Sequence, residues 1–208
     1  MKLFVNLLYY PIYNLGPGER VGLWLQGCSI QCKNCISKHT WYTSKKHEVK
    51  IETLAERINF FKTDKITISG GEPLDQAQNL ILLLQKIRPT KNDILLYTGY
   101  TLKNFINKNP NLWKEMKKLV DVIIDGPFIW GKETNLIWKG SENQKMYILN
   151  KNLLPIYKEY KQQTKKSLQI VENDGEFFLV GIPYQKDYYK LKELQFFSRD
   201  NVNSVSCH

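Results

Sequence analysis

The sequence predicts an α/β fold built on a mainly parallel sheet of about five or six strands. Short β-branched runs alternate with helical patterns between residues 21 and 149, and strands that alternate with helices pair in parallel through right-handed crossovers. Glycine follows several of these runs directly, so loops suited to close ligand contact gather at the carboxyl ends of the strands. So few strands cannot close into a barrel, and we expect one open side through which a large partner can enter.

Each element has its own local signal. Five β-rich runs predict the strands, at 21–26, 65–69, 93–98, 120–125 and 145–149. Three amphipathic patterns predict the helices between them, at 51–62, 75–88 and 101–118. Proline lacks the backbone N–H that a helix interior needs, so the third helix is expected to break near Asn109-Pro110.

The last part of the chain predicts a smaller unit. It contains a helical stretch, two β-rich runs and a second helical pattern, at 153–166, 168–172, 176–182 and 186–197. Asp174-Gly175 between the two runs is typical of a β-hairpin. We therefore divide the chain into a core, 1–150, that carries the functional site and an extension, 151–208, packed on that core within the same domain.

Composition and charge exclude some classes of function. The apolar start, Leu3 to Tyr10, is interrupted by Asn6 and stops at Pro11, which is too short to span a membrane. The formal charge is +10, yet lysine far exceeds arginine and falls mostly on predicted helix surfaces, where solvated lysine is ordinary. We expect a cytoplasmic protein that binds neither membranes nor nucleic acid, while attraction to an acidic protein surface stays open.

Three of the four cysteines fall within eight residues, as Cys28, Cys32 and Cys35. Thiolates this close in sequence are typical ligands of one metal centre, and three of them leave a four-iron cluster with one iron unligated by protein. An unligated iron can bind and activate a small molecule. Because the chemistry needs that open iron, we expect Cys207 to be a free surface thiol and not a fourth ligand.

Zinc is the main alternative for the same cysteines. His39 lies four residues after Cys35, and three cysteines with one histidine are a common tetrahedral zinc set. Structural zinc, however, usually takes two C-x-x-C-like pairs that are well separated, and the chain has no second pair. The pattern therefore favours iron-sulfur chemistry over a zinc-stabilised binding module without catalysis.

A second motif follows the expected strand at 65–69. The chain continues as two glycines, an acid and a proline, Gly70, Gly71, Glu72 and Pro73. Such a stretch ends a strand abruptly and lets the backbone approach a ligand closely. Gly-Gly alone is a common turn, but in combination with the cysteine run it is a strong indication of a cofactor site.

These two motifs together resemble those of the radical S-adenosylmethionine (SAM) enzymes. The resemblance implies that Cys28, Cys32 and Cys35 hold a [4Fe-4S] cluster, that SAM chelates the open iron, and that the Gly-Gly-Glu-Pro segment meets the SAM amino group. The expected cofactor-binding residues are Gly70, Gly71, Glu72, Pro73, Asn34 and Thr98. Asn34 is a departure, because many members have an aromatic residue there. The family's open, partial (β/α) barrel agrees with the fold predicted above.

Further blocks in a fixed order narrow the resemblance to the activating proteins of glycyl radical enzymes, and most closely to activators of anaerobic ribonucleotide reductase. The blocks are Gly16–Arg20, Val21–Gly27, Leu96–Thr101, Val122–Phe128 and Gly140–Gln144. Three further departures stand beside Asn34: Lys139 stands where arginine is usual, Glu142 replaces a small polar residue, and residues 29–31 lack the histidine often found between the first two cysteines. Residues 145–208 extend past the point where the smallest activators end.

The resemblance implies an enzyme that reductively cleaves SAM at the cluster to a 5′-deoxyadenosyl radical. That radical would take a hydrogen from a glycine of a partner glycyl radical enzyme, after an external donor such as flavodoxin or ferredoxin has reduced the cluster. A radical SAM enzyme that modifies a peptide is the alternative, with residues 145–208 supplying a binding hairpin.

Three side chains near the expected site have two interpretations each. Asp125 could bind a monovalent cation near SAM or cap the turn that follows it. Glu72 could touch SAM or orient its own loop. Arg20 could anchor an anionic group or form a structural salt bridge.

Overall fold

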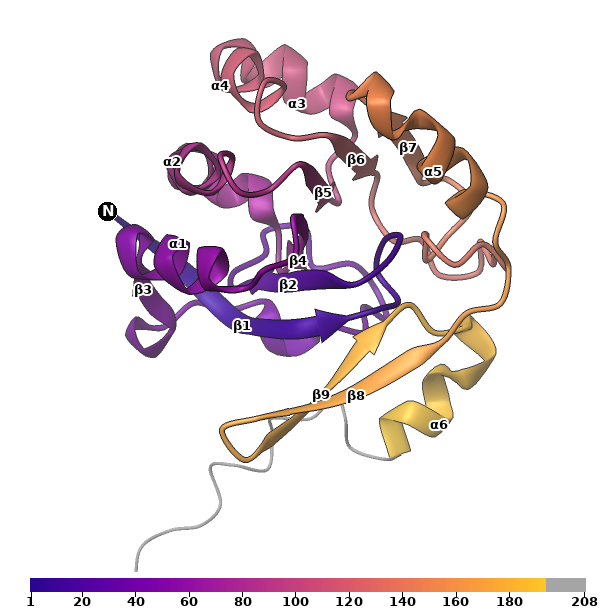
Figure 1. The fold of residues 1–208 in the computed structure, drawn as a ribbon. Helices are drawn as coiled ribbons and strands as arrows, with labels where there is room; N and C mark the ends of the chain where they lie inside the picture. Colours follow the sequence, from indigo (N-terminus) through magenta and orange to yellow (C-terminus); the bar gives the residue numbers. More distant parts are fainter. Residues whose placement is uncertain (194–208) are drawn as a thin grey trace, which may run out of the picture.

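The computed structural model describes residues 1–193 (Figure 1). Its main sheet has seven strands in the order β3-β1-β2-β4-β5-β6-β7, and β8 pairs with β9 in a separate hairpin. The strands are β1 (Lys2–Ile12), β2 (Arg20–Leu25), β3 (Glu48–Lys50), β4 (Lys65–Gly70), β5 (Asp93–Tyr97), β6 (Val122–Asp125), β7 (Lys145–Ile148), β8 (Leu168–Asn173) and β9 (Glu176–Gly181). The helices are α1 (Ile51–Phe60), α2 (Ala77–Ile87), α3 (Leu102–Lys108), α4 (Pro110–Met116), α5 (Leu154–Tyr160) and α6 (Tyr188–Glu193).

The centre of the main sheet is parallel, as predicted. β2, β4, β5 and β6 pair in parallel, because α1, α2 and the α3–α4 pair serve as the crossovers between them. The predicted break at Asn109-Pro110 separates α3 from α4. The mixed α/β class with a mostly parallel central sheet is therefore confirmed.

The two sides of the sheet bring it to seven strands, more than the five or six predicted. β1 pairs antiparallel with β2, and β3 pairs antiparallel with β1 at the edge of the sheet. Most of β1 is the apolar start of the chain. Asn6 and Pro11 interrupt its pattern, and its pairing with β2 shifts register at two places, so the segment has no clean alternation. β7 is antiparallel to β6 because no crossover helix lies between them.

The main core lies between the central strands and the helices, which form an arc around the sheet in Figure 1. Fully buried leucines and isoleucines of β2, β4 and β5 pack with those of α1 and α2. Burial of such side chains contributes about 1.5–3 kcal/mol each. This packing fixes the strand ends, and with them the loops that carry the predicted motifs.

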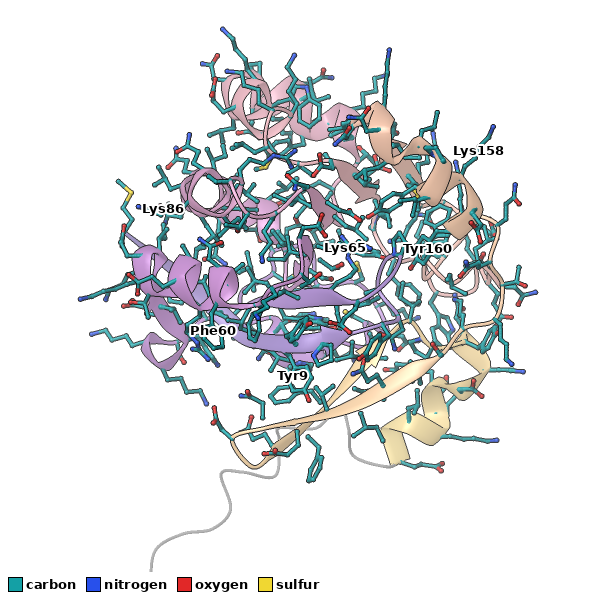
Figure 2. The ribbon with its side chains drawn as sticks, in the orientation of Figure 1. Tyr9, Phe60, Lys65, Lys86, Lys158 and Tyr160 are labelled. Atoms are coloured by element: carbon teal, nitrogen blue, oxygen red, sulfur yellow. The ribbon has the colours of Figure 1, made fainter. Side chains whose placement is uncertain are left out.

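Lysines lie on the outer helices, as the sequence predicts. Lys86 of α2 and Lys158 of α5 are both at the outside of the molecule (Figure 2). Lys86 has a side chain that is 46% exposed and pairs with Glu52 at 3.7 Å. No helix within residues 1–193 is long and apolar enough to cross a membrane.

Arg20 forms a structural salt bridge, which decides between its two interpretations. Its guanidinium is fully buried and donates to both carboxylate oxygens of Asp93, at 2.7 and 3.0 Å. The hydroxyl of Tyr157 in α5 donates to the same carboxylate at 2.6 Å. A buried charge pair is stable only when both partners and their hydrogen bonds are complete, so this group links the core sheet to the start of the extension.

The extension differs from the prediction in its first helix. α5 ends at Tyr160, not near 166, because the exposed residues that follow have no apolar face to bury. The predicted hairpin is confirmed, with Asp174 and Gly175 at positive φ in its turn. α6 covers part of the helix predicted at 186–197, and residues 186 and 187 belong to a 3-10 helix that precedes it, Gln185–Asp187. Residues 194–197 and Cys207 lie outside the described residues.

The hairpin packs on β1. Val171 and Val180 share a buried cluster with Leu7 and Ile12. The side chain of Asn14 donates to the Val180 carbonyl at 2.8 Å. The extension is thus held by the first strand of the chain, on the side of the sheet that the sequence did not predict.

Candidate iron-sulfur and cofactor site

The cysteine loop begins where β2 ends, and hydrogen bonds fix it to the segment that follows. The N–H of Gly27 donates to the carbonyl of Thr40 at 2.7 Å. The buried side chain of Gln26 donates to the carbonyls of His39 and Tyr42, at 2.9 and 2.7 Å. The two ends of the loop are therefore held together without any metal.

Within this loop the three cysteines are half-buried, form no disulfide and line one pocket. They are Cys28, Cys32 and Cys35. Gln31 and Asn34 between them have φ values of 48° and 57°, in the left-handed region that asparagine tolerates better than most residues. The departure from the family at Asn34 therefore suits the turn that precedes the third cysteine.

Burial raises the pKa of all three thiols, and that of Cys35 to about 11. Metal ions bind thiolates, so iron uptake at these cysteines has to release thiol protons. The carboxylates of Glu72 and Asp75 lie near enough to Cys28 to add to its raised pKa.

The Gly-Gly segment packs directly against the cysteine loop. The N–H of Gly71 donates to the Leu25 carbonyl and that of Glu72 to the Gly27 carbonyl, both at 2.8 Å. A Cβ atom on Gly71 would lie 2.1 Å from the Gly27 oxygen, which no side chain tolerates. Glycine here lets the loop after β4 touch the loop after β2, and both Gly70 and Gly71 line the pocket.

Glu72 holds two loops together. Its side chain is 1% exposed, and its carboxylate accepts from the Leu74 N–H, the Thr98 hydroxyl and the Gly99 N–H, at 2.9, 2.7 and 2.7 Å. Burial nevertheless raises the pKa of Glu72 to about 7. These contacts fit the orienting interpretation, although Glu72 also lines the pocket. Pro73 is buried and is not among the lining residues.

Asp75 is a site residue that the sequence analysis missed. Its carboxylate accepts from the N–H and the hydroxyl of Ser29, at 2.8 and 2.9 Å, directly after Cys28. The hydroxyl of Tyr100 donates to it at 2.7 Å. Asp75 therefore connects the cysteine loop to the loops after β4 and β5. Its only signal in the sequence is its place just after the Gly-Gly-Glu-Pro motif.

These loops surround one pocket at the carboxyl ends of the parallel strands. Of the residues predicted to bind metal or cofactor, all except Pro73 line it. Its empty space, open solvent at the mouth included, is about 1060 Å³. The sequence did not predict the apolar part of the lining, which includes Ile30, Ile36, Phe128, Trp130, Ile182 and Tyr188.

The donor set fits an iron-sulfur cluster. Each thiolate of a [4Fe-4S] cluster binds a different iron, so three cysteines surround the cluster and leave one iron open. A single zinc ion instead needs ligands that converge on one point. Within residues 1–193 no three His, Cys, Asp or Glu side chains, the three cysteines included, converge on one point, so the preference for a cluster rests on the number and spacing of the cysteines.

Asp125 caps the helix that follows β5. Its carboxylate accepts from the N–H of Leu102, the first residue of α3, at 2.6 Å. Asp125 is 4% exposed and does not line the pocket that holds the cysteines. The carboxylate therefore caps the start of α3 and not the turn that follows Asp125, so neither interpretation described this contact in advance.

The two departures at 139 and 142 are partners. The ammonium of Lys139 lies 2.6 Å from the carboxylate of Glu142 and also donates to the Glu142 carbonyl. Lys139 is 6% exposed, so a neutral residue at 142 would leave its charge without a carboxylate. The carboxylate of Glu142 therefore explains why a charged lysine can be buried at position 139.

Known proteins resemble this chain over most of the core. A family model described as a 4Fe-4S single cluster domain matches residues 14–147. The anaerobic ribonucleoside-triphosphate reductase-activating protein of Vibrio cholerae serotype O1 is 36% identical over 148 residues, which cover 65% of this chain and 92% of that protein. The protein of the same name from Escherichia coli (strain K12) is 34% identical over 156 residues, 68% of this chain and 96% of that protein.

Among solved structures, QueE from Escherichia coli aligns with 49% of this chain and 54% of its own, at 21% identity and a TM-score of 0.43. A similarity this low carries no argument about function. The alignments span almost the whole length of these two sequence relatives but leave about a third of this chain unmatched.

Proposed function

Because the chain belongs to the 4Fe-4S single cluster family, whose members include activating proteins of anaerobic ribonucleoside-triphosphate reductase, we propose that it is the radical SAM activase of such a reductase. The observation that carries the proposal is the pocket shared by three cysteines of one loop and the Gly-Gly-Glu segment. The parallel pairing of β2 and β4 brings the two motifs to one edge of the sheet, and there the sulfur donors and the glycine loop line the same pocket.

In this proposal Cys28, Cys32 and Cys35 bind the cluster. The SAM site consists of Gly70, Gly71, Glu72, Pro73, Asn34 and Thr98, of which Pro73 acts only by shaping the loop. With SAM bound, the reduced cluster supplies a 5′-deoxyadenosyl radical. The sulfur donors and the glycine loop of this chain are suited to that pair of ligands.

The chain's own side chains position and shield the site. Glu72 and Asp75 hold three loops in register, which keeps the reacting groups in place. Ile30, Phe128 and Trp130 give the pocket an apolar lining, which excludes water and stray hydrogen donors.

The protein substrate is proposed to be the partner's glycine, whose α-hydrogen is transferred as a hydrogen atom and leaves a glycyl radical. A large partner needs an open side, and β3 and β7, the two edges of the main sheet in residues 1–193, do not pair with each other. This supports an open, partial (β/α) barrel of the radical SAM type. An external donor such as flavodoxin or ferredoxin is proposed to reduce the cluster, in the reducing cytoplasm.

The extension is proposed to belong to the same domain as the core. Tyr157 of α5 is fully buried in contact with core residues, and the hairpin shares the buried cluster on β1. The extension could instead bind a peptide substrate. The experiment with the reductase, described below, distinguishes this role from reductase activation.

The test starts with anaerobic reconstitution with iron and sulfide, followed by dithionite, SAM and purified anaerobic ribonucleotide reductase. We expect 5′-deoxyadenosine in the product analysis and a glycyl radical signal in the EPR spectrum of the reductase. Cys32→Ala should abolish both, whereas the matched variant Cys207→Ala should retain both.

Full SAM cleavage by Cys32→Ala would overturn the cluster assignment. Uptake of zinc without a cluster signal would instead favour a structural metal module. SAM cleavage that never yields a glycyl radical on the reductase would redirect the search to a peptide substrate.

A further inference from the structure

The extension contributes one wall of the pocket. Residues 181–185 and Tyr188 line the same pocket as the three cysteines. The matching family model ends at residue 147, so this wall lies outside the part of the chain that the model matches. We name residues 181–188 the C-terminal wall.

Specific contacts hold the C-terminal wall against the loop after β6. Gln185 is 9% exposed, and its side chain accepts from the Gly131 N–H at 2.9 Å and donates to the Gly140 carbonyl at 3.4 Å. The ring of Tyr188 meets that of Trp130 edge-on, with centroids 5.1 Å apart. A polar side chain this buried, with partners on two segments of the core, indicates a built contact.

The wall presents apolar surface to the pocket. Ile182, Pro183 and Tyr188 line it beside Phe128 and Trp130 of the core. Pro183 has no backbone N–H to offer to water or ligand. Such a surface favours a dry site, in which a reactive intermediate meets few competing donors.

We propose that the C-terminal wall shields one side of the radical site and so limits the access of dissolved hydrogen donors such as small thiols. This inference rests on the proposed function. It assigns Tyr188 as a shielding residue and Gln185 as the positioning residue that holds the wall. The matched family model contains neither residue.

Two tyrosines provide a matched pair for the test. Tyr188 and Tyr189 both meet Trp130 edge-on, at 5.1 and 6.1 Å between centroids. Tyr188 is 7% exposed and lines the pocket, whereas Tyr189 is 60% exposed and does not. Tyr188→Ala should therefore open the wall, while Tyr189→Ala and the conservative Tyr188→Phe should leave it closed.

The first readout is independent of catalysis. In reconstituted protein without SAM, iron release to bathophenanthroline disulfonate should be about tenfold faster in Tyr188→Ala, because local opening exposes the cluster. Tyr189→Ala and Tyr188→Phe should release iron at the rate of the unaltered chain. Equal rates in Tyr188→Ala and Tyr189→Ala would overturn the inference.

The second readout measures leakage of the radical. With dithiothreitol in D₂O and no partner, the 5′-deoxyadenosyl radical takes a deuterium atom from the thiol. An S–D bond breaks, a C–D bond forms at the 5′ carbon, and dithionite reduces the thiyl radical that is left. Tyr188→Ala should incorporate deuterium into 5′-deoxyadenosine several-fold faster than Tyr189→Ala. It should also yield less glycyl radical for each SAM cleaved when the reductase is present.

The outcomes separate the two proposals. If the unaltered chain neither assembles a cluster nor cleaves SAM, the proposed function fails. If it does both, yet deuterium incorporation is the same in Tyr188→Ala and Tyr189→Ala, only the wall fails. If circular dichroism shows that Tyr188→Ala does not fold, Gln185→Ala replaces it in both readouts. Lys190→Ala, at an exposed residue, is then the control.

Discussion

The cysteine loop and the C-terminal wall face the same pocket but are held in different ways. The loop is fixed by backbone hydrogen bonds between strand ends and by the carboxylates of Glu72 and Asp75. The wall is held mainly by side chains: Gln185 bonds the Gly131 N–H, Tyr188 packs on Trp130, and the hydroxyl of Tyr184 bonds the Thr164 carbonyl. Backbone bonds survive a change of side chain, whereas a single substitution removes one of the wall's contacts. Changes in the core should therefore abolish the site, and changes in the extension should tune it.

The largest expected effect is at the buried charge pair below the core loops. Arg20→Ala should lower the free energy of unfolding by about 3–5 kcal/mol, because it leaves the buried Asp93 carboxylate without its cation. Urea unfolding of the metal-free protein measures this loss. Lys86→Ala is the matched control, since its pair with Glu52 is exposed and screened by solvent and should contribute little. Similar losses in both variants would contradict the structural role of Arg20.

The second prediction concerns the pH dependence of stability, which depends on Glu72 of the loop after β4. Burial raises the pKa of Glu72 from an ordinary 4.5 to about 7. Between these values the folded chain keeps a proton that the unfolded chain has released, so the free energy of unfolding falls as pH rises, by up to about 3 kcal/mol. Urea unfolding of the metal-free protein at about pH 5 and about pH 7 tests this. Glu72→Gln should flatten the dependence, and an unchanged slope in that variant would refute the assignment.

The smallest effect compares one anchor from each region. Asp75→Ala removes the bonds to Ser29, and Gln169→Ala removes the bonds that join the hairpin to Tyr13 and Pro11. Each should lower stability by about 1 kcal/mol. Only Asp75→Ala should also speed iron release to a chelator, because only Asp75 touches the cysteine loop. Equal iron release from the two variants would show that the regions are not separate.

The sequence allowed the centre of this fold and the meeting of its motifs to be predicted, for a simple reason. Parallel strands end at one edge of a sheet, so motifs that follow β2, β4 and β5 have to gather there. Local patterns carry no such rule for contacts between distant segments. The wall at Ile182 and Tyr188 and the anchor at Asp75 depend on such contacts, and the irregular β1 escaped prediction because Asn6 and Pro11 break its alternation.

The departures at Lys139 and Glu142 make the same point at the scale of single residues. Each considered alone looks like a deviation that puts partner recognition in doubt. Together they are an ion pair, with Lys139 also stacked on Trp138 at 5.1 Å. A single position in a sequence is therefore best judged with its spatial neighbour, which one sequence does not reveal.

The attachment of the hairpin to β1 joins two segments that the ribosome makes far apart in time. Asn14 and Val180, which bond directly, are 166 residues apart in the chain. The cysteines and the loops after β2, β4 and β5 leave the ribosome well before residues 181–188 are translated, and chains fold from the N-terminal side as they emerge. On the growing polypeptide the loops that carry the cysteines and the Gly-Gly segment are therefore present before the residues that line the other side of the pocket.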